Sequence, residues 1–226
     1  MTQQIPATGH PDEDQMFKSQ MEQMVDTYDA HMKRATFGRE QALRQTTVEL
    51  AGVKPGDYVL EVGCGTGTLT LAVKRQAGPT GKAFGIDVIP GMIEASRRKA
   101  AEAHEEITFQ EGSVDNIPFS ADQFDVVICS FMIFHMSQET RCNGISEIQR
   151  VLKPGGRLLL LDLVLPPQPF QRMIARKLLG FSAEDDLREM IPLMEASGFS
   201  DLEHGPAKFR LFGLSLIGYV RGNARK

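Results

Sequence analysis

Residues 59–67 read Val59-Leu60-Glu61-Val62-Gly63-Cys64-Gly65-Thr66-Gly67, an apolar run that passes directly into a loop with glycine at every second position. Three glycines allow the backbone to turn tightly and leave its N–H groups uncovered, so a ligand can approach the main chain closely. The stretch therefore predicts a buried strand followed by a ligand-binding loop. The alternative is a strand-to-helix turn that binds nothing.

Short apolar runs alternate with amphipathic runs on the C-terminal side of this loop. We expect strands at 58–62, 83–87, 107–110, 125–130, 157–162, 200–204 and 214–220, and helices at 68–76, 91–103, 138–152 and 183–197. Apolar strands that alternate with helices are typical of a parallel sheet covered on both faces, so the pattern predicts an α/β fold with a doubly wound sheet. Ligands of such sheets bind beyond the carboxyl ends of the strands.

The composition is that of one soluble globular domain. The chain has 226 residues, of which 42% are hydrophobic and 24% charged, with a net charge of −4. We expect a flexible stretch at 1–13 and a single domain at 14–226 that begins with helices at 14–52. The apolar runs are shorter than the ~18 residues of a membrane span, and no secretory signal is evident, so we expect a cytoplasmic protein.

Charge and cysteine content argue against three classes of protein. The mildly acidic balance gives no electrostatic reason to expect nucleic acid as a partner. Three cysteines, Cys64, Cys129 and Cys142, form neither an even set nor a CxxC pair, which argues against a disulfide framework and a zinc site. We therefore expect no metal.

Two elements after the glycine loop carry polar groups suited to a nucleoside. Asp87 ends the second expected strand twenty residues after Gly67, where a carboxylate can accept hydrogen bonds from both hydroxyls of a ribose. The stretch 110–119 could present polar groups to an adenine edge, although an aspartate such as Asp115 more often caps a helix or turn. The spacing GxGxG differs from the GxGxxG of dinucleotide-binding proteins, so a nicotinamide oxidoreductase is the less favoured reading.

Five stretches together carry a family resemblance. VLEVGCGTG (59–67), GIDVIPGMIEASRRKA (85–100), GSVDNIPF (112–119), FDVVICSFMIFHM (124–136) and EIQRVLKPGGRLLLLDL (147–163) resemble the successive motifs of class I S-adenosylmethionine-dependent methyltransferases. The resemblance covers about residues 40–221 and is strongest for type-11, quinone-biosynthesis and phospholipid N-methyltransferases. It implies a Rossmann-like sheet of seven strands, mostly parallel, in which the last strand is antiparallel.

The resemblance also implies S-adenosyl-L-methionine as the cofactor. Its methionine moiety is expected at Gly63, Gly65 and Gly67, with Glu61 orienting the amino group, its ribose at Asp87, and its adenine against Val88 and Met92 and beside Gly112, Ser113 and Val114. Cys64, Thr66 and Ser130 complete the expected cofactor-binding residues. Relatives commonly have an acid at the position of Ser113. The adenine contact can therefore shift to the Ser113 hydroxyl, the Val114 N–H or Asp115.

Methyl transfer from a sulfonium is an in-line displacement, so alignment and exclusion of water supply most of the rate. A general base is needed only for an acceptor that arrives protonated. His135, just after the fourth expected strand, is one candidate catalytic residue, with a structural role as the alternative. Tyr28 is the other, because it resembles a tyrosine that covers the active site in relatives; core packing is its alternative.

The choice of acceptor is expected to depend on two covering segments, the helices at 14–52 and residues 163–182. Residues 170–181 form a basic amphipathic pattern that suits either a lid on the same domain or a helix on a membrane surface. Quinone enzymes have a longer, tyrosine-rich insert here, whereas 163–197 lacks tyrosine. We expect an enzyme that methylates a small lipophilic molecule; a non-catalytic, cofactor-binding partner subunit is the alternative.

Overall fold

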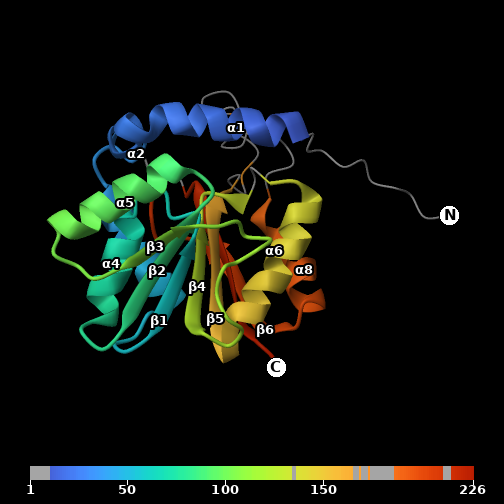
Figure 1. The fold of residues 1–226 in the computed structure, drawn as a ribbon. Helices are drawn as coiled ribbons and strands as arrows, with labels where there is room; N and C mark the ends of the chain where they lie inside the picture. The colour runs from blue at the N-terminus through green and yellow to red at the C-terminus, as the bar shows by residue number, and fades with distance from the viewer. Residues whose placement is uncertain (1–10, 134–135, 165–167, 169–172, 174–185, 211–214) are drawn as a thin grey trace.

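The computed structural model describes residues 11–133, 136–164, 168, 173, 186–210 and 215–226, with side chains from residue 18 onward. In this part of the chain seven strands form one sheet in the order β3-β2-β1-β4-β5-β7-β6 (Figure 1). The strands are β1 (Tyr58–Val62), β2 (Lys82–Asp87), β3 (Thr108–Glu111), β4 (Phe124–Ser130), β5 (Leu152–Leu163), β6 (Phe199–Pro206) and β7 (Ile217–Ala224).

The sheet has the mixed topology that the sequence predicts. Strands β1 to β5 run parallel, whereas β7 lies between β5 and β6 and is antiparallel to both. The doubly wound, mostly parallel sheet with an antiparallel last strand is therefore confirmed. The expected range 214–220 is wrong at both ends, because β7 begins at Ile217 and extends to Ala224. In β5, Leu152 and Arg157 pair with Phe124 and Val126, so residues 153–156 bulge out of the ladder.

Side chains that alternate along each strand build two cores, one on each face of the sheet. Leu60 and Val62 belong to the core under α6 (Gln138–Val151), η3 (Leu187–Glu189) and α8 (Met190–Ala196). Val59 points to the other face, where it packs with α3 (Glu40–Ala51) and α4 (Thr68–Ala77). Helix α5 (Pro90–Glu102) lies beside α4 in Figure 1. Helices on both faces are thus confirmed.

The expected helices agree closely with the observed ones except at the C-terminal end of the chain. Helices α4, α5 and α6 each differ from their expected ranges by one residue at one or both ends. The expected helix 183–197 is observed as the turn η3 followed by α8, and residues 183–185 lie outside the described part. No helix in the described ranges is both long enough and apolar enough to cross a membrane.

Three N-terminal elements, α1 (Pro11–Met24), η1 (Val25–Thr27) and α2 (Tyr28–Ala35), lie across the edge of the sheet where the parallel strands end (Figure 1). They pack directly on the start of α5. A Cβ built on Gly91 would lie 3.0 Å from Glu22 Oε1 and 3.1 Å from Val25 Cγ2. A side chain at Gly91 would press on these two residues, so glycine permits the close packing. The N-terminal helices therefore cover the carboxyl ends of the strands.

Candidate ligand-binding site

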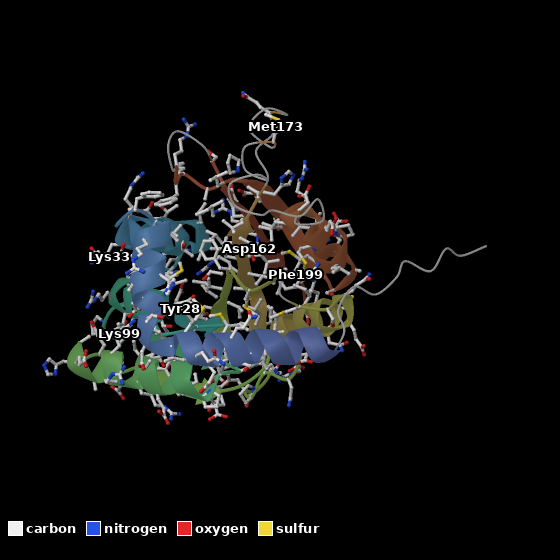
Figure 2. All side chains as sticks on the ribbon, turned by 90° about the horizontal axis from the view of Figure 1, so that it is seen from above. Tyr28, Lys33, Lys99, Asp162, Met173 and Phe199 are labelled. Carbon is white, nitrogen blue, oxygen red and sulfur yellow. The ribbon has the colours of Figure 1, made fainter. Side chains whose placement is uncertain are left out.

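The carboxyl ends of the strands and the N-terminal helices enclose a cavity of about 240 Å³. Its roof comes from α1 and α2, its floor from the glycine loop, and its far wall from the loop after β4 and from α6. Figure 2 looks down on this edge, and Tyr28 is labelled where α1 and α2 meet. The lining residues are Lys18, Met21, Tyr28, Val62, Gly63, Gly65, Asp87, Val88, Ile89, Met92, Gly112, Ser113, Val114, Asp115, Ser130, Phe131, Met132, Met136 and Thr140.

The glycine loop adopts a backbone conformation that side chains disfavour. Gly63, Gly65 and Gly67 have φ values of 71°, 51° and 75°. A Cβ on Gly63 would lie 2.8 Å from Met132 Sδ, and one on Gly67 would lie 2.8 Å from the ring of Phe109. Both the left-handed backbone and the lack of space therefore require glycine in this loop.

Asp87 occupies the end of β2 and is 9% exposed. Its Oδ2 accepts a hydrogen bond from Gly65 N at 2.9 Å, and its Oδ1 accepts one from Ile89 N at 3.0 Å. Burial raises the pKa of Asp87, and the backbone donors act in the opposite direction. Each carboxylate oxygen can accept a further hydrogen bond, so Asp87 is able to receive a pair of ligand hydroxyls.

An apolar surface next to Asp87 faces the cavity. Val88 is 40% exposed, although it follows directly on a buried strand. Beyond it, Gly112, Ser113 and Val114 form the adjoining edge, where the Ser113 hydroxyl bonds to Asp115. A flat, partly apolar ring of a ligand could lie on Val88 and present its edge to the polar groups of Gly112, Ser113 and Val114.

Glu61 lies on the opposite face of β1 from Leu60 and Val62 and does not line the cavity. Its Oε2 accepts a hydrogen bond of 2.5 Å from Thr70 Oγ1 on α4. Burial raises the pKa of Glu61 to about 7, and the Thr70 hydrogen bond counteracts this. The carboxyl group of Glu61 therefore lies buried between β1 and α4. Its contact with a ligand stays a prediction.

Three other expected residues of the glycine loop also lie behind the cavity wall. Cys64, Thr66 and Gly67 do not line it. Burial raises the pKa of Cys64 well above its usual value, so this thiol is protonated at neutral pH. Thr66 points instead to the N-terminal helices. The other expected ligand-binding residues all line the cavity.

A polar network, which we call the Asp29 clasp, joins α2 to the glycine loop and α5. Asp29 Oδ1 accepts from Thr66 Oγ1 at 2.6 Å, and its Oδ2 accepts from Lys99 Nζ at 2.7 Å. Lys99 Nζ also donates to Thr66 and Thr68 at 2.8 and 2.7 Å. Burial raises the pKa of Asp29, but the bonds from Lys99 and Thr66 outweigh it, and the pKa lies below its usual value. The clasp holds the neighbouring Tyr28 against Gly65.

The loop after β4 is held in a defined shape. Phe131 has a φ of 57°, which non-glycine residues rarely adopt. The next buried residue, Ile133, is fixed at both backbone atoms: its N–H donates to Asp162 Oδ2 at 3.2 Å, and its carbonyl accepts from Arg141 Nε at 3.1 Å. His135, the candidate base, lies outside the described residues, and its role stays a prediction.

The geometry agrees with what is known of related chains. Residues 59–156 match the family model described as a methyltransferase domain. The chain is therefore similar to methyltransferases over this domain. A solved structure of a SAM dependent methyltransferase from Aquifex aeolicus superposes with a TM-score of 0.64 at 20% identity, over 90% of this chain and 98% of that one, which shows the shared fold.

Curated methyltransferases are similar in sequence over the same domain. The demethylmenaquinone methyltransferase of Symbiobacterium thermophilum is 34% identical over 165 residues, which cover 72% of this chain and 64% of that protein. The ubiquinone/menaquinone biosynthesis C-methyltransferase UbiE of Ralstonia pickettii is 32% identical over 145 residues, which cover 64% and 59%. The chain thus spans less than two thirds of the length of these relatives.

Sequence reasoning missed two features of this site. It did not find the clasp residues Asp29 and Lys99 or the roof residues Lys18 and Met21. The sequence around Tyr28 and Asp29 pointed to part of the clasp, but Lys99, the partner of Asp29, lies 70 positions further along the chain. In the ranges described above, no group of three or more His, Cys, Asp or Glu side chains is placed to hold a metal ion.

Proposed function

We propose that this protein transfers the methyl group of S-adenosyl-L-methionine to a small lipophilic acceptor of quinone-like type. One observation carries the proposal. A single cavity has one end suited to a nucleoside, at Asp87 and Val88, and an apolar end at Phe131, Met132 and Met136. The names of the relatives supply the acceptor class, since they specify methylation in menaquinone and ubiquinone biosynthesis.

The residues present fit the adenosyl part of this cofactor. The free hydrogen-bonding capacity of Asp87 matches the two ribose hydroxyls, and the exposed face of Val88 matches the adenine ring. The methionine moiety would then lie over Gly63 and Gly65, where the absence of side chains permits close approach. Ser113 and Val114 would meet the adenine edge.

When bound, the cofactor supplies an electrophilic methyl group on a sulfonium. The protein contributes alignment, because the displacement requires donor sulfur, methyl and acceptor in line. Tyr28 closes the roof over Gly65 and excludes water, while Met132 and Met136 give the acceptor an apolar surround. We assign to His135 the removal of a proton from an acceptor that arrives as a phenol or enol.

We further propose that residues 163–182 complete the cover at the acceptor end. Of these, the structure describes 163, 164, 168 and 173, and Met173 is 59% exposed (Figure 2). The basic amphipathic pattern of 170–181 supports contact with a membrane surface, from which a lipophilic acceptor could enter. This arrangement corresponds to a cytoplasmic enzyme at the periphery of the membrane.

The decisive test is ligand binding by the wild type and the Asp87→Ala variant. We expect S-adenosylmethionine and S-adenosylhomocysteine, but not NADH, to raise the unfolding temperature; a ligand at 100 times its Kd adds about 2.7 kcal/mol of stability. Asp87→Ala should lose this effect, whereas Glu102→Ala, at an exposed position on α5, should keep it. Stabilisation by NADH alone would overturn the proposal.

Turnover is then measured with methyl-labelled cofactor and lipophilic quinols, phenols and amines. Label should appear in a quinol and depend on Asp87. Ligand binding without transfer to any acceptor would favour the non-catalytic subunit instead.

A further inference from the structure

Asp162, near the carboxyl end of β5, is a buried carboxylate that the proposed transfer step does not use. It is 5% exposed and lies toward the middle of the molecule in the view from above (Figure 2). Its Oδ1 accepts a hydrogen bond from Leu163 N at 2.8 Å, and its Oδ2 accepts one from Ile133 N at 3.2 Å. Burial of a carboxylate costs free energy, so its presence here calls for a gain elsewhere in the molecule.

The hydrogen bond to Ile133 begins where the pairing of β4 with β5 ends. Ser130 pairs with Leu161, and the N–H of Phe131 donates to the Leu161 carbonyl at 2.9 Å. Phe131 then has a φ of 57°, which turns the chain away from the extended path of the strand. Without the Asp162 carboxylate, the N–H of Ile133, a residue only 2% exposed, would lose its acceptor. The carboxylate therefore fixes the backbone at the start of the loop after β4.

This loop carries the apolar wall of the cavity, which consists of Phe131, Met132 and Met136. Met132 also packs directly over the glycine loop, since a Cβ built on Gly63 would lie 2.8 Å from its Sδ and 3.3 Å from its Cβ. Met132 stands between Phe131 and Ile133 in the chain, so a shift of Ile133 would move Met132 relative to Gly63. The bond at Ile133 therefore sets the spacing between the apolar wall and the glycine loop.

We propose that Asp162 is a positioning residue, which holds the apolar wall at the distance that in-line methyl transfer to the acceptor requires. Asp162 is not among the residues that line the cavity, so it acts through Ile133. A displacement of about 1 Å between reacting groups can cost about 100-fold in rate. The inference rests on the proposed function. Loss of the carboxylate should impair transfer and the choice between acceptors, whereas cofactor binding at Asp87 and Val88 should stay intact.

The test replaces Asp162 with asparagine, which has the same shape but only one oxygen to accept from the two backbone N–H groups. Transfer of labelled methyl by the full chain is measured with two quinols, one with a single ring and one with two fused rings. We expect kcat/KM for the better quinol to fall about 10- to 100-fold and the ratio of the two kcat/KM values to move toward one. The Kd of S-adenosylhomocysteine, measured by calorimetry, should stay within about threefold of wild type.

Asp125→Asn serves as the matched control. Asp125 also accepts a hydrogen bond from a backbone N–H, that of Tyr58 at 2.8 Å, but it does so at the opposite end of the parallel strands. This variant should lower the unfolding temperature, as Asp162→Asn does, because each loses an acceptor for a backbone N–H. It should change neither kcat/KM nor the ratio between the two quinols.

Two results with Asp162→Asn would overturn the inference. One is unchanged transfer to both quinols, and the other is a loss of cofactor affinity as large as the loss of transfer, which would show general structural support of the whole site. Absence of transfer by the wild type would refute the proposed function and this inference with it. If Asp162→Asn does not fold, Asp162→Ser decides, because it is neutral, keeps one acceptor oxygen and must show the same loss of transfer with intact cofactor affinity.

Discussion

Replacing Glu61 with glutamine should remove a pH dependence of folding that this one carboxyl group creates. Burial behind the glycine loop raises its pKa from 4.5 to about 7 in the folded protein. Between these values the folded state keeps a proton that the unfolded state loses. The stabilisation by Glu61 is therefore fully present below about pH 4.5 and is lost as the pH rises to about 7.

The magnitude follows from the size of the pKa change. A change of this size corresponds to about 3 kcal/mol, at about 1.36 kcal/mol for each pKa unit. Glutamine is uncharged at every pH and can still accept the hydrogen bond from Thr70, so Glu61→Gln should resemble the protonated wild type. Near pH 4.5 the two proteins should have similar free energies of unfolding. Above pH 7 the variant should be the more stable by up to about 3 kcal/mol.

Urea unfolding at half-unit steps from pH 4.5 to pH 8 measures this difference. Glu102→Gln, at an exposed position on α5, serves as the matched control and should follow the wild type throughout. Parallel profiles for the wild type and Glu61→Gln would refute the reasoning, because they would mean that Glu61 is ionised in the folded protein at the same pH as in the unfolded chain.

Three further substitutions test the site. Gly67→Ala should destabilise the fold by at least about 1 kcal/mol more than Gly38→Ala in urea unfolding, because both glycines have φ of 75° but only at Gly67 would the new Cβ clash; equal effects would contradict this. Asp29→Asn should speed release of S-adenosylhomocysteine severalfold in stopped-flow measurements, since it weakens the bond to Lys99; an unchanged rate would show that the clasp does not limit release. Val88→Asp should weaken adenosyl ligands at least tenfold and change stability by no more than about 0.5 kcal/mol, because this side chain is 40% exposed; intact affinity would argue against adenine at this position.

The sequence predicted those parts of the fold that local pattern encodes. Apolar runs bounded by turn residues located β1 to β5 in order, and the glycine loop located the ligand end of the sheet. The range of β7 was wrong because its buried positions toward the C-terminal end are Gly222 and Ala224, which alternate with Arg221 and Asn223. Small residues can be buried in a strand without making the sequence hydrophobic. The pattern therefore predicted an end of the strand that lies too early in the chain.

The site was less predictable because its side chains meet through tertiary packing. Asp29 and Lys99 are 70 positions apart, and no spacing rule joins them. Glu61 shares its face of β1 with Val59, so the alternation that buries Val59 also turns this carboxyl group toward α4 and away from the cavity.

The position of β7 in the sheet has a consequence for synthesis on the ribosome. Among the strands that the structure describes, β6 precedes β7 in the chain but pairs only with it, and the edge of β5 opposite β4 is likewise closed by β7 alone. Until residues 217–224 emerge, a nascent chain therefore exposes one edge of β5 and both edges of β6. Unpaired strand edges promote association with other chains, so a chaperone that binds extended segments would act on this protein chiefly during that interval.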